Sequence, residues 1–490
     1  MNARQIGLML GPLVFALSAL TPPPGGLEPQ GWLVAGLVIW MAAWWMTEAV
    51  PLTVTALLPF IVLPLGGIMS AGDTASAYYA PILFLLLGGA FIALAIERTG
   101  LHRRLSAGIL RAIGTGGGQT RLLLAFMLSA AILSMLISNT STTLIMMPMA
   151  LAVLAGGGLA HRENDQDQDG QTQEGQAQEG LYGALPMGIA FAATIGGLGT
   201  IVGSPTNGIA VQLLNDMIGL EISFALWMLY GLPVVLIGVP LAAFVIARVQ
   251  QVAAHPFDVA AARTAIDNPA PWTSAERRLV PIIALAFLAW MTRLWVAPLL
   301  PPDSWTDGTI AVIAALALFL IPDGTGTEGN RRPLLKWNEA DRAPWGVILM
   351  FGGGLALAAG MQASGLADWL GQALLPLDAV PLLVMALAIA AMVVVITEFA
   401  SNVATASAII PIVASLAAAL GLGEDAILIA MPAALAASWG FILPAGTGPN
   451  AIAWSTGRLR IERLVRAGIV LDIIGIALMV GVVWCASTIF

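Results

Sequence analysis

Two short clusters of hydroxyl and amide side chains stand inside otherwise apolar sequence. The first, at 138–143, reads Ser-Asn-Thr-Ser-Thr-Thr, and the second, at 401–405, reads Ser-Asn-Val-Ala-Thr. Ser, Asn and Thr are favoured at the N-caps of helices. A helix that begins at such a residue directs free N–H groups and the positive end of its dipole at whatever lies in front of it, which makes its first turn suited to anions.

Each cluster has a partner rich in glycine and proline later in the chain. These partners are Gly-Ser-Pro-Thr-Asn at 203–207 and Gly-Thr-Gly-Pro-Asn at 446–450. Glycine and proline interrupt helices, and the freed carbonyls, with hydroxyls and amide oxygens, suit a small cation. The clusters contain no Arg, Lys or His, so bound cations would lower the cost of holding a dianion at low dielectric constant. The residue types predict coupled binding of cation and anion.

These motifs belong to an internal repeat. Three pairs of segments match in the same order along the two halves of the chain: 85–93 with 350–358, 134–139 with 397–402, and 203–210 with 446–453. In the second pair, Ser134 corresponds to Thr397. The repeat predicts two sites of the same design, one in each half.

The composition sets the environment of these motifs. The chain has 490 residues, of which 58% are apolar and 10% charged, and its mean hydropathy is +0.88. A soluble protein carries about 25% charged residues, so a cytosolic enzyme, a nucleic-acid binder and a disordered protein are excluded. The single cysteine, Cys485, and three widely separated histidines give no disulfide and no metal-ligand spacing. A polytopic membrane protein remains, with room for roughly 10 to 12 spans of about 20 residues.

Apolar runs predict the spans. Helices are expected near 6–20, 31–47, 52–69, 80–97, 183–214, 224–247, 279–298, 308–321, 345–361, 428–454 and 467–489. Two further apolar stretches, 120–156 and 380–420, are too long for one span, and each half is too short to cross comfortably. Each has a polar cluster at its middle, which is typical of a re-entrant hairpin or of one long tilted helix.

The distribution of basic residues distinguishes a re-entrant hairpin from one long tilted helix. Basic residues gather at 98–121, 248–278, 331–342 and 458–466, and short basic loops stay cytoplasmic. All four clusters fall on one face only if both stretches are hairpins that return to their own side. The prediction is therefore an all-α membrane protein with 11 transmembrane helices and two re-entrant hairpins, the N-terminus cytoplasmic and the C-terminus outside.

In this topology the two repeats are inverted, as in many secondary transporters. The predicted organisation is an N-terminal span and outer loop (1–30), a first repeat (31–250), a cytoplasmic linker (251–278) and a second repeat (279–490). The first repeat contains the hairpin at 120–156 and a polar cytoplasmic loop at 160–181, and the second contains the hairpin at 380–420.

The paired Ser-Asn motifs, the two interruptions and the Thr-Glu-Ala-Val-Pro-Leu segment at 47–52 resemble the divalent anion/sodium symporter family over nearly the whole chain. The resemblance implies a homodimer in a bacterial inner membrane, built from a scaffold and a transport domain that moves like an elevator. It implies a transporter rather than an enzyme, with sodium as the coupling ion, no other cofactor and no nucleic-acid partner.

The resemblance also implies roles for individual residues. One sodium would bind at Ser134, Ser138, Asn139 and Gly203, and a second at Thr397, Ser401, Asn402 and Gly446. Substrate would contact Ser138, Asn139, Thr140, Ser204, Ser401, Asn402, Val403 and Thr447. Two positions depart from the family pattern: Val403 replaces Thr and removes a hydroxyl from the substrate side, and Gly448 replaces the first Pro after Thr447.

The resulting prediction is sodium-coupled symport of a divalent anion, with C4-dicarboxylates (succinate, malate, fumarate) or citrate expected first. The alternatives are symport of sulfate or another inorganic oxyanion, and sodium-independent exchange of dicarboxylates. A sodium/proton antiporter would want an essential carboxylate at the tips, which offer hydroxyls and amides instead. Glu398 adjoins the second motif and is a candidate proton or cation group, because carboxylates inside a membrane are usually functional.

Overall fold

The computed structural model describes residues 3–113, 118–164, 179–255, 257–259, 271–325, 331–444 and 446–489. In this part of the chain the regular elements are helices, apart from one isolated bridge between Pro322 and Pro333. Nine of the described helices are long and apolar enough to cross a membrane, and four shorter apolar helices accompany them. The molecule is therefore an all-helical, polytopic membrane protein.

The N-terminal part forms α1 (Ala3–Leu20), α2 (Pro29–Thr47), α3 (Leu52–Thr55), α4 (Leu58–Leu65), α5 (Ala71–Ala77), α6 (Ile82–Thr99) and α7 (Leu101–Ile113). The single helix predicted at 52–69 is wrong, because it is divided between α3 and α4. Pro59 stands in the first turn of α4 and has no N–H to donate to the carbonyl oxygen of Thr55, so the helical hydrogen bonding is interrupted between α3 and α4.

The first hairpin and the segments after it form α8 (Gln119–Ser134), α9 (Asn139–Asn164), α11 (Leu181–Gly197), the 3-10 turn η1 (Ile201–Gly203), α12 (Pro205–Ile218) and α13 (Phe224–Val249). The continuous helix predicted at 183–214 is wrong in its middle, where residues 198–204 leave the helix and α12 restarts with proline at its first position. The hairpin extends beyond residue 156, since α9 continues to Asn164. Residues 165–178 of the polar loop lie outside the described ranges.

The second half forms η2 (Val252–Ala254), α15 (Ser274–Val296), η3 (Ala297–Leu299), α16 (Asp307–Leu320), α17 (Trp337–Ala340), α18 (Trp345–Ala363), α19 (Leu366–Leu374), η4 (Leu375–Ala379), α20 (Leu382–Phe399), α21 (Asn402–Ala419), η5 (Gly423–Ala426), α22 (Ile427–Ala436), α23 (Gly448–Ser455) and α24 (Ile461–Ile489). The predicted helix at 428–454 is likewise broken, between α22 and α23. Of the linker predicted at 251–278, residues 260–270 lie outside the described part, and its last residues already belong to α15.

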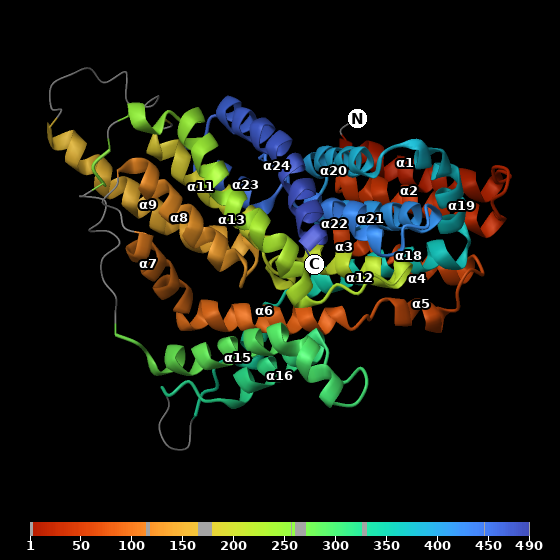
Figure 1. Cartoon of the computed structure of the whole chain (residues 1–490), viewed down its shortest axis with the longest axis horizontal. Helices are drawn as coiled ribbons and strands as arrows, with labels where there is room; N and C mark the ends of the chain where they lie inside the picture. The colour runs from red at the N-terminus through yellow and green to blue at the C-terminus, as the bar shows by residue number, and fades with distance from the viewer. Residues whose placement is uncertain are drawn as a thin grey trace.

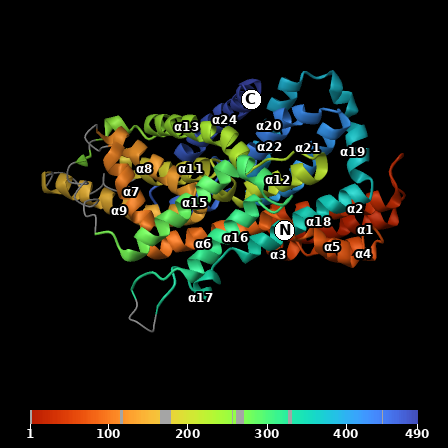
Figure 2. The same ribbon diagram turned by 60° about the horizontal axis from the view of Figure 1, so that its bottom comes forward.

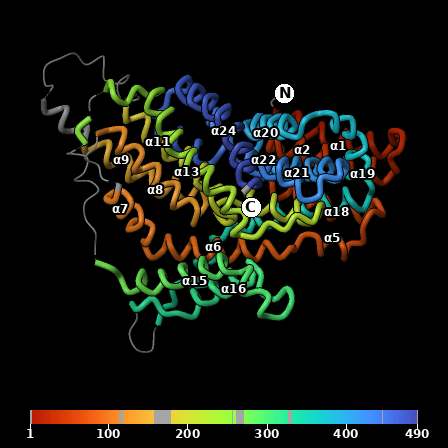
Figure 3. The backbone as a smooth tube through the Cα atoms, viewed as in Figure 1, coloured from red at the N-terminus to blue at the C-terminus, as the bar shows by residue number. Residues whose placement is uncertain are grey.

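The two halves interlock around two helix breaks. The first break separates α11 from α12, and the second separates α22 from α23. The first hairpin, with α11 and α13, lies toward one end of the long axis, and the second hairpin, with α1, α2 and α19, lies toward the other (Figures 1 and 3). After its break, α12 packs against α21 of the second hairpin, while α23 packs against α9 and α11 of the first half. Each post-break helix therefore reaches into the other repeat, which brings both breaks to the middle of the molecule. Helix α6 packs against α16 along one side (Figure 2).

Close packing between α11 and α8 fixes the position of the first break. Nearly all of α11 is buried, and it lies directly against α8. A Cβ atom added at Gly196 would stand 2.4 Å from the backbone of Ala131, so the two helices are in backbone contact, as small residues allow between membrane helices. The break that follows Gly197 is thus anchored on one side by a rigid helix pair.

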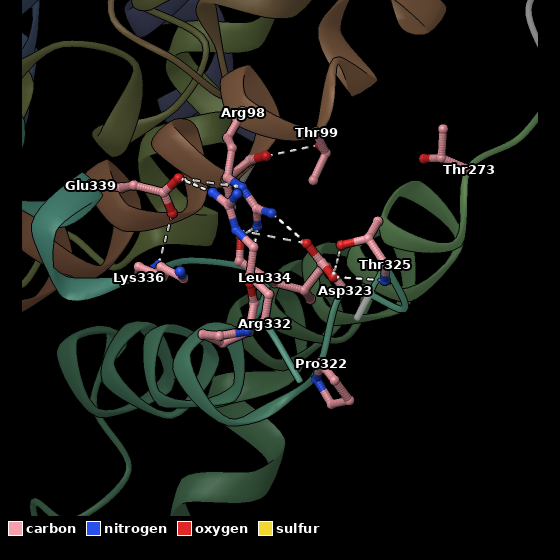
Figure 4. A network of polar contacts seen from close by, with 12 residues as sticks. Arg98, Thr99, Thr273, Pro322, Asp323, Thr325, Arg332, Leu334, Lys336 and Glu339 are labelled. Carbon is pink, nitrogen blue, oxygen red and sulfur yellow. Dashed lines mark hydrogen bonds and ion pairs between the residues drawn. The ribbon is translucent and has the colours of Figure 1, made fainter. Parts of the chain in front are cut away.

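A buried ion-pair network ties the end of α6 to the connection between α16 and α18. Arg98 lies between the carboxylates of Asp323 and Glu339 (Figure 4). Asp323 is 1% exposed, and its Oδ1 accepts hydrogen bonds from the backbone N–H of Thr325 (2.9 Å) and from the Thr325 hydroxyl (2.7 Å). Arg98 also donates to the carbonyl oxygen of Pro333 at 3.0 Å. The network therefore closes this connection onto α6.

The network predicts a loss of stability in acid. Burial alone would raise the pKa of Asp323, but hydrogen bonds from Thr325 and the Arg98 guanidinium outweigh burial and hold this pKa below its ordinary value. The ion pair therefore stabilises the fold fully above the unfolded-state pKa of about 4, and its contribution is lost as pH falls through the lowered pKa of the folded state. We expect Asp323→Asn to remove this acid dependence and to lower the free energy of unfolding at neutral pH by about 3 kcal/mol.

Thermal unfolding of the detergent-solubilised protein, followed by tryptophan fluorescence between about pH 5 and pH 3, measures this effect. Asp341→Asn, which alters an exposed carboxylate beside α17, is the matched control. Equal acid sensitivity in wild type and Asp323→Asn would show that another group governs stability in this range.

Candidate functional site

One cavity of about 420 Å³ lies where the two hairpins meet the two breaks. Ten of the twelve residues predicted for the substrate and sodium sites line it: Ser138, Asn139, Thr140, Gly203, Ser204, Ser401, Asn402, Val403, Gly446 and Thr447. The other two, Ser134 and Thr397, are fully buried. The structure therefore brings residues from four distant segments of the sequence to a single chamber.

Four helices begin at this cavity. Residues immediately before α9, α12, α21 and α23 line its wall, namely Ser138, Ser204, Ser401 and Thr447. Ser401 Oγ accepts a hydrogen bond from the Ala404 N–H, and Thr447 Oγ1 accepts one from the Asn450 N–H, both at 3.2 Å. Four positive dipole ends thus point at one chamber, which favours an anion there.

Behind the first hairpin tip, oxygen atoms converge on Asn139. With its amide nitrogen turned toward them, Asn139 lies 2.7 Å from Ser134 Oγ, 3.1 Å from the carbonyl oxygen of Ala193 and 3.2 Å from that of Gly203. Turned the other way, the amide oxygen joins these three oxygens, with only the Ser134 hydroxyl proton among them. A small cation would satisfy all four oxygens in that second orientation, so this cluster has the chemistry of a sodium site.

The second hairpin repeats this arrangement. The Thr397 hydroxyl lies 2.9 Å from Asn402 Oδ1 and 2.8 Å from the carbonyl oxygen of Ala437. One hydroxyl proton cannot satisfy both acceptors at full strength, so oxygen is again in excess. The two halves of the chain therefore build matching oxygen clusters, each around an asparagine that lines the cavity.

Asparagines in the first turns of α12 and α23 hold the irregular backbone of the breaks that precede these helices. Asn207 Nδ2 donates to the carbonyl oxygens of Gly197 and Thr200, both at 2.8 Å, and Asn450 Nδ2 donates to that of Leu443 at 3.2 Å. The Thr200 hydroxyl donates to the Met135 carbonyl at 2.6 Å and joins the first break to its hairpin. Sequence reasoning missed these positioning roles, although Asn207 and Asn450 recur at the same place in the repeat.

The second break has a different anchor. The two carboxylate oxygens of Glu398 accept hydrogen bonds from the backbone N–H groups of Ile442 and Leu443, each at 3.0 Å. Glu398 is 3% exposed and does not line the cavity. Its carboxylate therefore acts on the backbone of the break rather than directly on a substrate.

An ion pair that the sequence motifs did not indicate stands at the edge of the cavity. Glu97 of α6 and Arg342, which precedes α18, both line it, and their side chains approach to 3.8 Å. Arg342 is 56% exposed. Arg342 thus adds a cationic side chain to the lining that also contains the hydroxyl and amide residues.

The structure also shows where the two unusual residues lie. Val403, which follows Asn402 in the chain, is part of the cavity lining. A Cβ atom at Gly448 would stand 2.6 Å from Thr140 Oγ1, so this glycine lets the first hairpin tip approach the start of α23. The second departure therefore has a packing reason, whereas the first changes the chemistry of the wall.

Residues 2–489 match the family described as the sodium:sulfate symporter transmembrane region. The chain belongs to this divalent anion/sodium symporter family. Members of this symporter family similar to the chain include the sodium-dependent dicarboxylate transporter SdcS of Staphylococcus saprophyticus, 37% identical over 98% of this chain and 91% of the relative. SdcS of Staphylococcus aureus strain USA300 is 38% identical with the same coverage. Like these relatives, members of the symporter family are transporters rather than enzymes.

The fold has a counterpart among solved structures. The crystal structure of the YdaH transporter of Alcanivorax borkumensis aligns with a TM-score of 0.54, covering 99% of this chain and 98% of that one at 14% identity. At this identity the likeness shows a shared fold alone. The family match and the relatives, not this structure, confirm the family membership that the motifs predicted.

Proposed function

We propose that this protein imports C4-dicarboxylates, or citrate, together with sodium ions. One observation carries the proposal: two matching oxygen clusters flank a cavity at which four helices begin. The clusters suit monovalent cations and the helix N-termini suit a dianion. The sodium-dependent dicarboxylate transporters that resemble the chain supply the substrate class.

Coupling follows from the order of binding. Sodium at Asn139 and Asn402 would fix the orientation of both amides and neutralise part of the charge that a dianion brings into the chamber. The dianion would then be held by the hydroxyls and helix ends at Ser138, Ser401 and Thr447. Because each cation lowers the electrostatic cost of the anion, dicarboxylate affinity should rise with sodium concentration.

The cavity has a polar wall and an apolar wall, and this division fits an elevator movement of one wall relative to the other. The hairpin tips and breaks supply its hydroxyl and amide groups, whereas α6 and α18 contribute mainly apolar residues such as Leu86, Ala90 and Val347. A substrate held by the polar wall could travel with it past the apolar one. The predicted 11 spans, homodimer, inner-membrane location and cytoplasmic N-terminus belong to this proposal.

Uptake of radiolabelled succinate into proteoliposomes tests the proposed function. Three arms are needed: an inward sodium gradient, an inward potassium gradient, and unlabelled succinate inside without sodium. The proposal predicts accumulation only in the sodium arm. Uptake that needs only internal succinate would make the protein an exchanger, and sodium-driven uptake of sulfate without succinate would make it an oxyanion symporter.

Val403 should influence which anion is preferred. Val403→Thr adds a hydroxyl to the cavity wall beside Asn402 at almost constant volume, and one added hydrogen bond to a charged group is worth about 1.5 to 3 kcal/mol. We expect the KM ratio between succinate and sulfate to change by about tenfold or more. Competition of each anion against labelled succinate measures the ranking. An unchanged ranking would show that position 403 does not select the substrate.

A further inference from the structure

The cavity extends along α6, and its two ends differ in chemistry. At one end Val202 lies against α6, because a Cβ atom added at Gly89 would stand 2.8 Å from the Val202 side chain. Val202 directly precedes Gly203 of the first oxygen cluster. Glu97, which also lines the cavity, follows Gly89 by eight residues on α6, about 12 Å along the helix axis. The ion pair of Glu97 with Arg342 is therefore well separated from the oxygen clusters.

This ion pair marks the mouth of the cavity. The side chains of Arg342 and Glu97 are 56% and 39% exposed, whereas Ser204 and Thr447, before α12 and α23, are buried. Between Gly89 and Glu97, the residues of α6 that line the cavity are apolar: Ala90, Ala93 and Leu94. An anion that moves through this mouth between water and the helix N-termini passes both charged side chains.

The contact between the two side chains is weak enough to be exchanged for another. The nearest side-chain nitrogen of Arg342 and oxygen of Glu97 are 3.8 Å apart, which is longer than a hydrogen bond, and exposed ion pairs contribute little to stability. Among the described residues, neither side chain has another ion pair. A free carboxylate can accept two parallel hydrogen bonds from a guanidinium, so it would compete well with Glu97.

The buried network around Arg98 holds the backbone on both sides of this contact. The Arg342 N–H donates to the carbonyl oxygen of Glu339 at 3.3 Å, and the Glu339 carboxylate is paired with Arg98, the neighbour of Glu97, and with Arg332 (Figure 4). The chain is thus fixed at both positions while the Arg342 side chain stays exposed. Of the residues that line the cavity, Arg342 is the one basic residue and Glu97 the one acidic residue.

We propose that Arg342 forms a second, transient binding site for carboxylates at the mouth of the cavity, separate from the oxygen clusters and helix N-termini. Glu97 pairs with Arg342 while no anion is present, and an arriving carboxylate displaces it. The guanidinium attracts anions into a cavity with apolar walls, where its field is weakly screened. The negative charge of Glu97 limits this attraction, so that a captured anion can leave again.

The reactivity of a cysteine inside the cavity tests this site independently of transport. The starting protein carries Cys485→Ser, which removes the single cysteine, and Ala93→Cys, at a cavity-lining position of α6. Modification rates with anionic sulfonatoethyl and cationic trimethylammonioethyl methanethiosulfonate are compared in the detergent-solubilised, full-length protein. Arg342→Gln should lower the ratio of anionic to cationic rate by about tenfold, and Glu97→Gln should raise it.

Arg331→Gln is the matched control for this experiment. Arg331 is an exposed residue of the same connection before α18 and does not line the cavity, so its loss removes the same charge and should leave the rate ratio unchanged. An unchanged ratio in Arg342→Gln, or an equal fall in Arg331→Gln, would overturn the proposal. Anion preference that depends on Arg342 in a protein that carries no succinate would support this site and overturn only the proposed function.

Succinate uptake by membrane vesicles of both orientations tests the consequence for transport, which rests on the proposed function. The mouth lies beside the basic residues at 98–121 and 331–342, which are predicted to be cytoplasmic. Arg342→Gln should therefore raise the succinate KM by about tenfold in inside-out vesicles, and the KM in right-side-out vesicles should not rise. A rise in both orientations, or none in inside-out vesicles, would contradict a separate site at this mouth.

Discussion

Asn139→Ala and Asn402→Ala are each expected to reduce sodium-driven succinate uptake by at least about a hundredfold while leaving a folded protein. Each asparagine is the centre of one oxygen cluster, beside Ser134 in the first repeat and Thr397 in the second. Removing one side chain that contacts a charged group costs about 1.5 to 3 kcal/mol of binding free energy. The substitution weakens binding of the sodium ion and also of the anion, because anion binding depends on sodium. Either substitution alone should therefore cause this loss of sodium-driven succinate uptake.

Initial rates of uptake at several sodium concentrations measure this effect, and thermal unfolding in detergent checks the fold. Asn338→Ala provides the control, because Asn338 is exposed on α17 and does not line the cavity. If both substitutions at the hairpin tips left the rate and its sodium dependence intact, the tips would not be the coupling site.

Gly197→Ala should have the next largest effect, although no motif singles this residue out. A Cβ atom there would stand 2.1 Å from Asn139 Oδ1 and 2.9 Å from its Cγ, so the amide must leave the oxygen cluster. We expect the sodium KM to rise by more than about tenfold, corresponding to 1.4 kcal/mol of lost binding. Gly440→Ala, at the matching place in the second repeat, meets Thr397 and Glu398 at 3.1 and 3.2 Å and should be milder.

The control for both is Gly108→Ala, on the exposed face of α7, where an added Cβ atom meets nothing within 4 Å. Sodium titrations of succinate uptake compare the three variants with wild type. A Gly197→Ala protein with the wild-type sodium KM would mean that the Asn139 amide does not bind the coupling ion.

Local signals made much of the fold predictable. Long apolar runs placed most of the candidate spanning helices, and the stretch at 380–420 forms two consecutive helices, α20 and α21, between residues 382 and 419. Gly203, Pro205 and Pro449 indicated the two breaks in the sequence, but apolar runs continue across both. Hydropathy alone therefore predicted one continuous helix at 183–214 and one at 428–454, where each is broken.

Other parts of the site depend on packing between segments far apart in the chain, which no local pattern contains. The carbonyl oxygens of Ala193 and Ala437 reach the two clusters only because the breaks fold back against the hairpins. The symmetry of the repeat was the one long-range signal available from sequence, and it located the site for that reason.

The most direct test of the coupling model is the ratio of sodium to succinate carried. Proteoliposomes loaded in parallel with radioactive sodium and radioactive succinate, at saturating concentrations of both, give this ratio from initial rates. Two clusters of equal design predict at least two sodium ions with each succinate, and no succinate-stimulated sodium flux in Asn139→Ala or Asn402→Ala. Succinate entry without sodium entry would contradict the account.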